Sequence, residues 1–154
     1  MKSDFFEKYC LHDSEIYDIS LNDNCFSLFL RYVLVLEDIE SGGNRVEETY
    51  QDLKIEFRAD ENDINIWSLL QYPCAGVVKI NGETVSVEDI RDMLKKGRSI
   101  QIVEFLKSVD SNYWVFDAEL LPYAEGGGVY DRIVIEISSE SDTFKFCESN
   151  SLHF

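Results

Sequence analysis

A thiol, an imidazole and a carboxylate lie within one short segment near the start of the chain, at Cys10, His12 and Asp13. An imidazole that contacts a thiol can remove its proton and so create a nucleophile. Cys10 and His12 could also bind zinc together with His153, but these residues lack the short ligand spacing of a recognised zinc motif. Polar side chains in an irregular turn usually hydrogen-bond to nearby backbone groups. We therefore interpret His12 and Asp13 as a structural turn and expect no metal site there.

Two further patterns resemble parts of enzyme sites. Asp117 and Glu119 are two positions apart in an alternating segment, so both side chains are expected to point away from the core. Glycosidases place two carboxylates about 5–9 Å apart in a cleft, whereas neighbouring acids on an outward face are usually solvated. The glycines of 126–128 are followed neither by the Lys-Ser/Thr pair nor by the helix of a phosphate-binding loop. The sequence therefore predicts no catalytic residue and no cofactor.

The alternation of apolar and polar residues predicts the elements that must position these side chains. It predicts strands over 15–21, 25–36, 52–58, 64–72, 99–106, 113–121 and 130–138, and a short edge strand over 143–147. Polar residues over 37–51 predict a loop or a hairpin tip, and Asn81-Gly82 suits the turn of a second hairpin. Helices are predicted over 4–10, after Ser3, and over 87–96, between Ser86 and Gly97.

These elements predict one domain that spans residues 1–154. A chain of 154 residues that is 45% hydrophobic is long enough to bury a core without disulfides or metals. Short turns between consecutive strands favour antiparallel pairing. The predicted fold class is α+β, with a mainly antiparallel, twisted or curved sheet and two short helices packed on it.

The charge is strongly negative and unevenly distributed. The formal net charge is −16, and residues 37–63 carry ten acids and three bases, a net −7. Such a field repels nucleic acid and anionic membranes and attracts cationic partners. We therefore predict a basic protein as partner, bound by carboxylates of the polar segment and of the outward strand face. The predicted partner-binding residues are Glu37, Asp38, Glu40, Glu47, Glu48, Asp117 and Glu119.

A cytoplasmic location is expected from the absence of several sequence features. The start of the chain has no signal-peptide pattern. No stretch approaches the about 20 apolar residues of a spanning helix. The four cysteines include no CxxC pair and read as reduced thiols.

The short helix predicted near the start of the chain and the segment 11–31 after it resemble the entry to a group of small bacterial proteins. Several members of that group are uncharacterised or are immunity proteins of polymorphic toxin systems. In that group a His-Asp-Ser/Ala turn precedes two strands, and His12, Asp13 and Ser14 match the turn. The apolar positions after the turn match at Ile16, Ile19, Leu28 and Leu30. The resemblance covers about the first fifth of the chain. It implies an α+β scaffold without catalytic residues, in which the Asp13 carboxylate satisfies backbone donors and an acidic surface occludes a basic toxin.

Together these features predict a non-enzymatic acidic binding protein, most plausibly an immunity protein that neutralises a toxin by steric and electrostatic occlusion. Two alternatives remain open. One is a small-ligand-binding module whose concave sheet is lined by aromatic residues such as Trp67, Tyr72 and Trp114, although Trp114 falls on the inward side. The other is a hydrolase that uses Cys10 and His12 or a pair of carboxylates.

Overall fold

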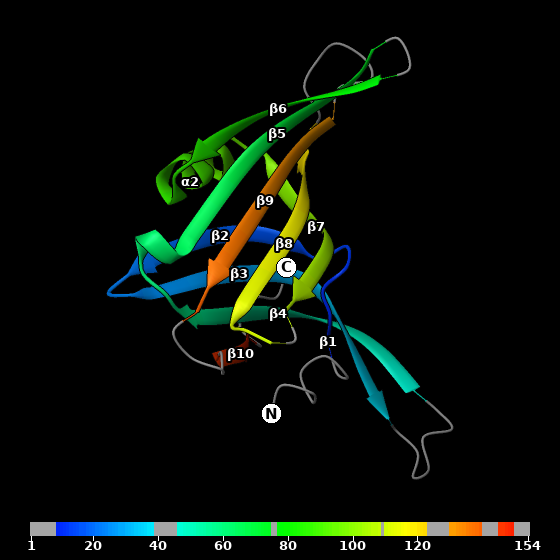
Figure 1. Ribbon diagram of the computed structural model, residues 1–154. Coiled ribbons are helices and arrows are strands. Elements are labelled where there is room, and N and C mark those ends of the chain that lie inside the picture. Colours follow the sequence, from blue (N-terminus) through cyan, green and yellow to red (C-terminus); the bar gives the residue numbers. More distant parts are fainter. Residues whose placement is uncertain are drawn as a thin grey trace.

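The part of the chain that the structure describes forms one antiparallel sheet. The computed structural model describes residues 9–38, 46–74, 77–108, 110–122, 130–139 and 145–149. Across these residues the strand order is β10-β4-β3-β2-β7-β8-β9-β5-β6, and β1 pairs with β3 off this path (Figure 1). The strands are β1 (Tyr9–Cys10), β2 (Glu15–Asn22), β3 (Cys25–Asp38), β4 (Val46–Arg58), β5 (Ile64–Cys74), β6 (Val77–Val85), β7 (Ser99–Lys107), β8 (Tyr113–Leu121), β9 (Tyr130–Ser138) and β10 (Lys145–Ser149).

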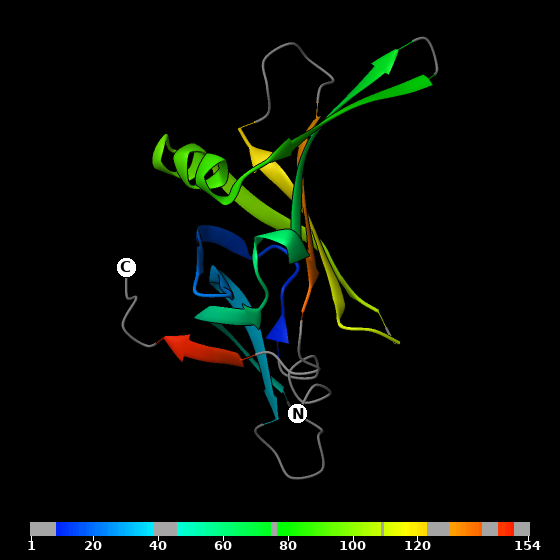
Figure 2. The same ribbon diagram turned by 60° about the vertical axis from the view of Figure 1, so that its left-hand side comes forward.

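The sheet bends where β2 meets β7. β1 and β2 pair with the same edge of β3. The turn that connects β1 to β2, residues 11–14, does not pair with β3. In this turn the Asp13 N–H donates to the Ile102 carbonyl at 2.9 Å, and the Ile102 N–H donates to the Ser14 carbonyl at 2.8 Å. These bonds extend the short β2–β7 ladder. The bend separates a first layer, β10-β4-β3-β2, from a second layer, β7-β8-β9-β5-β6 (Figure 2).

The core lies between the two layers and consists of the inward side chains of both. Phe57 of β4 contacts Trp114 and Phe116 of β8, with ring centroids 5.4 and 6.1 Å apart. Since β4 and β8 lie several strands apart in the sheet order, these contacts show that the layers pack face to face. The largest fully buried side chains are Trp114, Phe26, Phe57, Phe116, Ile16, Ile19, Leu28, Leu30, Ile55, Ile90 and Ile100.

Helix α2 (Val87–Lys95) packs over β2 and β7. It begins with a capping box, in which the Ser86 side chain accepts from the Asp89 N–H and the Asp89 carboxylate accepts from the Ser86 N–H. It ends before Gly97, whose φ of 90° favours glycine. Ile90 is its fully buried contact with the core. No helix among the described residues is long and apolar enough to cross a membrane.

Gly97→Ala is expected to lower the free energy of unfolding by about 1 kcal/mol, because a side chain strains this backbone conformation. A Cβ atom at Gly97 would meet no other atom within 4 Å, so the loss comes from the backbone alone. Urea denaturation measures the change, with Lys96→Ala as the matched control. Gly97→Asn should lose less, because asparagine tolerates positive φ. Equal stability of the alanine variant and the wild type would contradict this account.

The predicted α+β class with two packed helices is wrong. The described residues contain one α-helix, α2, and one 3-10 turn, η1 (Glu61–Asp63), within a structure dominated by strands. Part of the helix predicted over 4–10 lies outside the described residues. Its end, Tyr9–Cys10, is strand β1, because Tyr9 pairs with Val35 and Cys10 with Leu34. Tertiary pairing outweighs local helix propensity there.

The hairpin turn predicted at Asn81-Gly82 is also wrong. Both residues lie inside β6, where Gly82 pairs with Leu69 and Asn81 with Leu70 of β5. The connection between β5 and β6 falls at 75–76, outside the described residues. Among the described residues β6 ends the sheet and pairs only with β5, and an edge strand tolerates residues of low β propensity.

Most strand predictions are confirmed. The strands predicted over 15–21, 25–36, 52–58, 99–106, 113–121 and 130–138, and the helix over 87–96, agree with the structure to within a few residues, except that β4 begins earlier. The polar segment predicted over 37–51 is shorter than expected, since β3 continues to Asp38 and β4 starts at Val46. The short edge strand is present as β10, which pairs with β4.

Candidate protein-binding face

The His12–Asp13 turn joins the two layers through its backbone. The His12 Nδ1 atom lies 3.0 Å from Asp13 Oδ2, and both side chains are mostly exposed. The buried Ser14 hydroxyl donates to the Leu11 carbonyl at 2.6 Å. Within the described part of the chain the Asp13 carboxylate contacts His12 and accepts no backbone hydrogen bond, unlike the arrangement that the resemblance implied. Among the described residues no hydrogen bond joins Cys10 to His12, so the turn does not assemble a thiol–imidazole pair.

The outward side of the second layer gathers residues from four strands. The register aligns three cross-strand rows on β7, β8, β9 and β5, and we call these rows the outer face. They are Gln101–Glu119–Arg132–Leu69, Glu104–Asp117–Val134–Trp67 and Leu106–Val115–Glu136–Asn65. In Figure 2 no described element lies over the outward side of β8 and β9. The outer face therefore presents an apolar and acidic surface to solvent.

Two large apolar side chains of the outer face are well exposed. Trp67 is 37% exposed and Leu106 is 54% exposed. Val115 and Val134 lie between them in the rows and are half-buried. An exposed aromatic beside aliphatic side chains is typical of the centre of a protein interface.

The Glu136 carboxylate is fixed on the outer face by two aromatic donors. The Trp67 indole N–H donates to Glu136 Oε1 at 2.8 Å. The Tyr113 hydroxyl donates to Glu136 Oε2. This hydrogen bond, followed by burial and by the charge of Glu136, raises the pKa of Tyr113 above its ordinary value of 10.0. The three side chains therefore form a preorganised acceptor whose orientation does not depend on a partner.

Glu136→Ala is expected to lower the pKa of Tyr113 toward 10.0, because the variant loses both the hydrogen bond and the negative charge. NMR spectra of tyrosine labelled at the ring Cζ, recorded across the alkaline range, measure this pKa. Tyr113→Phe assigns the signal, and Trp67→Phe is the control, since it removes the other donor but leaves the Tyr113 contact. An unchanged Tyr113 pKa in Glu136→Ala would contradict the described contact.

Asp117 does not present a free carboxylate. The Arg132 guanidinium donates from Nε to Asp117 Oδ1 at 3.1 Å and from Nη2 to Oδ2, a two-point ion pair. Glu119 lies directly opposite Arg132 in the ladder. Counting Glu104, Asp117, Glu119 and Glu136 against Arg132, four minus one, the outer face carries a net charge of −3. The face stays negative after its internal pairing.

The other predicted binding residues lie at the β3–β4 hairpin. Glu37 is the register partner of Glu47, and Glu48 is the partner of Leu36. Asp38 is the last residue of β3, and Glu40 lies outside the described residues. Two acids at directly opposed positions disfavour strand pairing. For Glu37, Asp38, Glu47 and Glu48 the structure describes the backbone alone.

Other candidates from the sequence have separate locations. Trp114 is 1% exposed and belongs to the core, whereas Trp67 belongs to the outer face. Tyr72 lies in β5, and its side chain is outside the description, as are the glycines of 126–128. Within the described ranges no three His, Cys, Asp or Glu side chains gather as metal ligands do.

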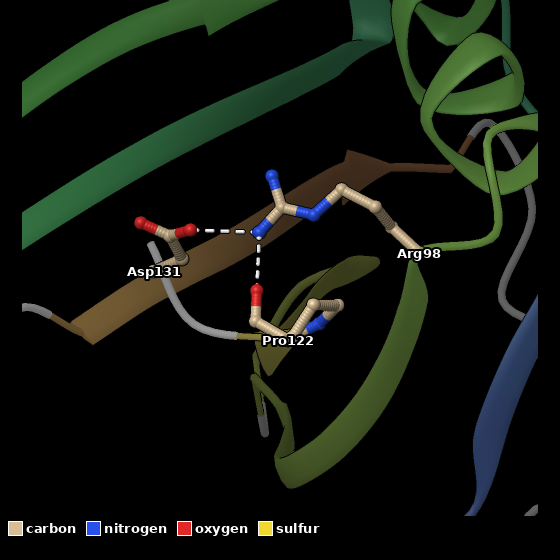
Figure 3. Close-up of polar contacts among 3 residues, drawn as sticks. All are labelled: Arg98, Pro122 and Asp131. Carbon is tan, nitrogen blue, oxygen red and sulfur yellow. Dashed lines mark hydrogen bonds and ion pairs between the residues drawn. The ribbon is translucent and has the colours of Figure 1, made fainter. Parts of the chain in front are cut away.

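A buried carboxylate that sequence reasoning missed belongs to a structural contact. Asp131 is buried at the start of β9, and its Oδ2 accepts from Arg98 Nη2 at 2.7 Å (Figure 3). The same nitrogen donates to the Pro122 carbonyl at 2.8 Å. Arg98 follows α2, so its guanidinium ties the helix exit to the ends of β8 and β9. We therefore interpret this contact as structural.

Sequence reasoning also missed Trp67, Tyr113 and Glu136 as a group. Each lies at an outward position of its own strand, but the three come from β5, β8 and β9. The alternation of apolar and polar residues could have assigned each of the three side chains to the outward side. Their proximity follows only from the register between the strands.

Comparison with known proteins adds no relative. No family model, curated protein or solved structure matches this chain.

Proposed function

We propose that this protein is a non-enzymatic binding protein that covers a basic surface of a partner protein with its outer face. The observation that carries the proposal is the Trp67–Glu136–Tyr113 group, a fixed carboxylate beside an exposed indole. Tryptophan and tyrosine are enriched among the residues that dominate binding energies. A carboxylate already oriented by the protein loses little freedom when a cation binds it.

Charge supports a basic partner. The chain carries a net −16, and the outer face carries a net −3 around its apolar centre. Complementary charge speeds association and excludes acidic competitors. The more specific form of the proposal is toxin neutralisation, in which the partner is a basic toxin domain inside the cytoplasm. This form rests on the resemblance of the segment that includes His12, Asp13 and Ser14.

The test uses the protein encoded by the reading frame directly upstream of the gene for this protein, which the proposal predicts to carry a basic toxin domain. Co-expression is expected to restore growth of cells that produce this domain, and the purified proteins should form a complex. The variant Trp67→Ser/Glu136→Lys should weaken the complex by at least about 30-fold, as loss of a central interface residue does.

Asp92→Lys on the exposed side of α2 is the matched control, because it reverses a charge away from the outer face. Its dissociation constant should equal that of the wild type once the effect of the altered total charge is subtracted. The salt dependence of the dissociation constant measures that effect. Full rescue and wild-type affinity in the Trp67→Ser/Glu136→Lys variant would rule out the outer face as the binding surface. Failure of the wild type to bind the domain would rule out toxin neutralisation.

The acidic residues of the β3–β4 hairpin are expected to increase the rate of association with the partner rather than to stabilise the bound complex. Reversing Glu37, Asp38, Glu47 and Glu48 together should lower the association rate constant about tenfold at low salt and leave the dissociation rate constant nearly unchanged. Stopped-flow fluorescence of Trp67 on mixing with the same toxin domain measures both constants. A large rise in the dissociation rate constant would show instead that these carboxylates lie inside the interface.

A further inference from the structure

A groove opens beside the start of helix α2 and shares one lining residue, Asn65, with the outer face. It has a volume of about 530 Å³ and lies where the end of β2, η1, the start of β5, the end of β6 and the start of α2 meet. Pockets that bind small molecules usually have volumes of about 300–1,000 Å³, so the groove has room for a long side chain.

The floor of the groove is apolar. Leu21, Val85 and Val87 line it and pack, partly buried, against the core. Their side chains come from β2, β6 and α2 respectively, so the floor joins the two layers. Such a floor suits the methylene groups of a long side chain, which bury along apolar surface while the charged end stays at the rim.

The rim of the groove is acidic. Glu61 of η1 and Glu88 in the first turn of α2 line it and are exposed. Neither carboxylate has a hydrogen bond or ion pair among the described residues, and no lysine or arginine lines the groove. The other rim residues include Asn62, whose amide oxygen can accept a hydrogen bond. The groove therefore offers acceptors and negative charge to whatever enters it.

The helix start in the rim does not make the groove an anion site. A helix N-terminus attracts anions through its unpaired N–H groups. Here the Ser86 hydroxyl accepts from the Asp89 N–H at 3.1 Å, and the Asp89 carboxylate accepts from the Ser86 N–H at 2.9 Å. The carboxylate of Asp89 also places a negative charge at this helix end. An added anion would meet this charge together with Glu61 and Glu88.

We propose that this groove binds an arginine side chain presented by an extended segment of a partner protein. The methylene groups of the arginine pack on Leu21 and Val87, and its guanidinium lies between Glu61 and Glu88. A guanidinium has five N–H donors in one plane and can serve two carboxylates at once. None of these four residues belongs to the outer face, so each site can be tested with its own variants.

The experiment titrates the full-length protein with three short peptides that differ at one position. The peptides are acetyl-Gly-Ala-Xaa-Ala-Gly-amide with arginine, its uncharged isostere citrulline, or glutamate at Xaa. Methyl NMR signals of Leu21, Val85 and Val87 report binding. Saturable shifts of these signals are expected with the arginine peptide, with an at least about tenfold weaker response to citrulline and none to glutamate. Glu61→Gln/Glu88→Gln should weaken arginine binding at least about tenfold.

Two variants serve as controls. Glu83→Gln and Asp92→Asn remove exposed carboxylates that do not line the groove, and both should bind the arginine peptide like the wild type. Thr84→Arg places a guanidinium at the rim and should block the peptide in a folded protein, as checked by unchanged core methyl signals. Equal binding of the arginine and citrulline peptides, or unchanged binding in Glu61→Gln/Glu88→Gln, would overturn the proposal. The outer-face variant Trp67→Ser changes no residue that lines the groove and should bind the arginine peptide like the wild type.

Discussion

Trp114→Ala is expected to lower the free energy of unfolding by about 3–5 kcal/mol, the range for removal of a large buried aromatic side chain. Trp114 is 1% exposed, and its ring lies 5.4 Å from Phe57 and 5.6 Å from Phe105. The Phe57 contact lies between the two layers, whose backbone pairing is limited to the short β2–β7 ladder among the described residues. Removing the indole therefore leaves a cavity between the layers. The few backbone hydrogen bonds between β2 and β7 do not replace the lost contacts.

Chemical denaturation of Trp114→Ala measures the loss, and Val115→Ala is the matched control. Val115 is the next residue of β8, points to the outer face and is half-buried. It should lose less than about 1.5 kcal/mol, because the neighbouring side chains there can relax into solvent. Similar losses in the two variants would contradict the assignment of Trp114 to an interlayer core.

The second large effect is expected at the Arg98–Asp131 contact. Removing one partner of a buried ion pair leaves an uncompensated charge and destabilises proteins by about 3–5 kcal/mol. Arg98 keeps 30% of its side chain exposed, whereas Asp131 keeps 6%. Because water reaches the guanidinium, we expect Arg98→Leu to lower the free energy of unfolding by about 2 kcal/mol. The lost bond to Pro122 contributes to this value.

A double variant separates the charge effect from packing. Arg98→Leu/Asp131→Leu should be more stable than Arg98→Leu alone, because it removes the buried charge that the single variant leaves without its partner. Glu56→Gln is the control, since its ion pair with Lys54 is about one third exposed on both sides and should contribute less than about 1 kcal/mol. A double variant less stable than Arg98→Leu would show that Asp131 has a favourable role independent of Arg98.

Local pattern predicted much of the fold, but not its class. The alternation of Ile133, Ile135 and Ile137 identified β9, and Ser86 with Gly97 bounded α2, because the physical causes of these elements lie within each segment. Tyr9 and Cys10 became a strand through Val35 and Leu34, which lie far along the chain. Asn81-Gly82 likewise joined a strand because β5 offered a continuous partner. Pairing of this kind is a long-range property that propensity does not record.

The candidate site was predictable residue by residue but not as a surface. Asp117 and Glu119 were correctly placed on the outward side of β8. The ion pair of Asp117 with Arg132 and the contacts of Glu136 with Trp67 and Tyr113 depend on the register of neighbouring strands. The contact with Trp67 requires β5 to pair with β9, although the two strands are far apart in the sequence. The groove beside α2 depends in the same way on how two layers meet.

Hydroxyl-radical footprinting of the complex with the proposed toxin domain tests most directly whether the outer face binds a basic partner. The method reports oxidation of exposed side chains, and Trp67 and Leu106 of the outer face are both accessible in the free protein. Tyr32 and Tyr50, which are 48% and 68% exposed on the first layer, are internal controls. The account predicts that Trp67 and Leu106 become protected in the complex while Tyr32 and Tyr50 oxidise as before. Protection of Tyr32 and Tyr50 with Trp67 left accessible would contradict it.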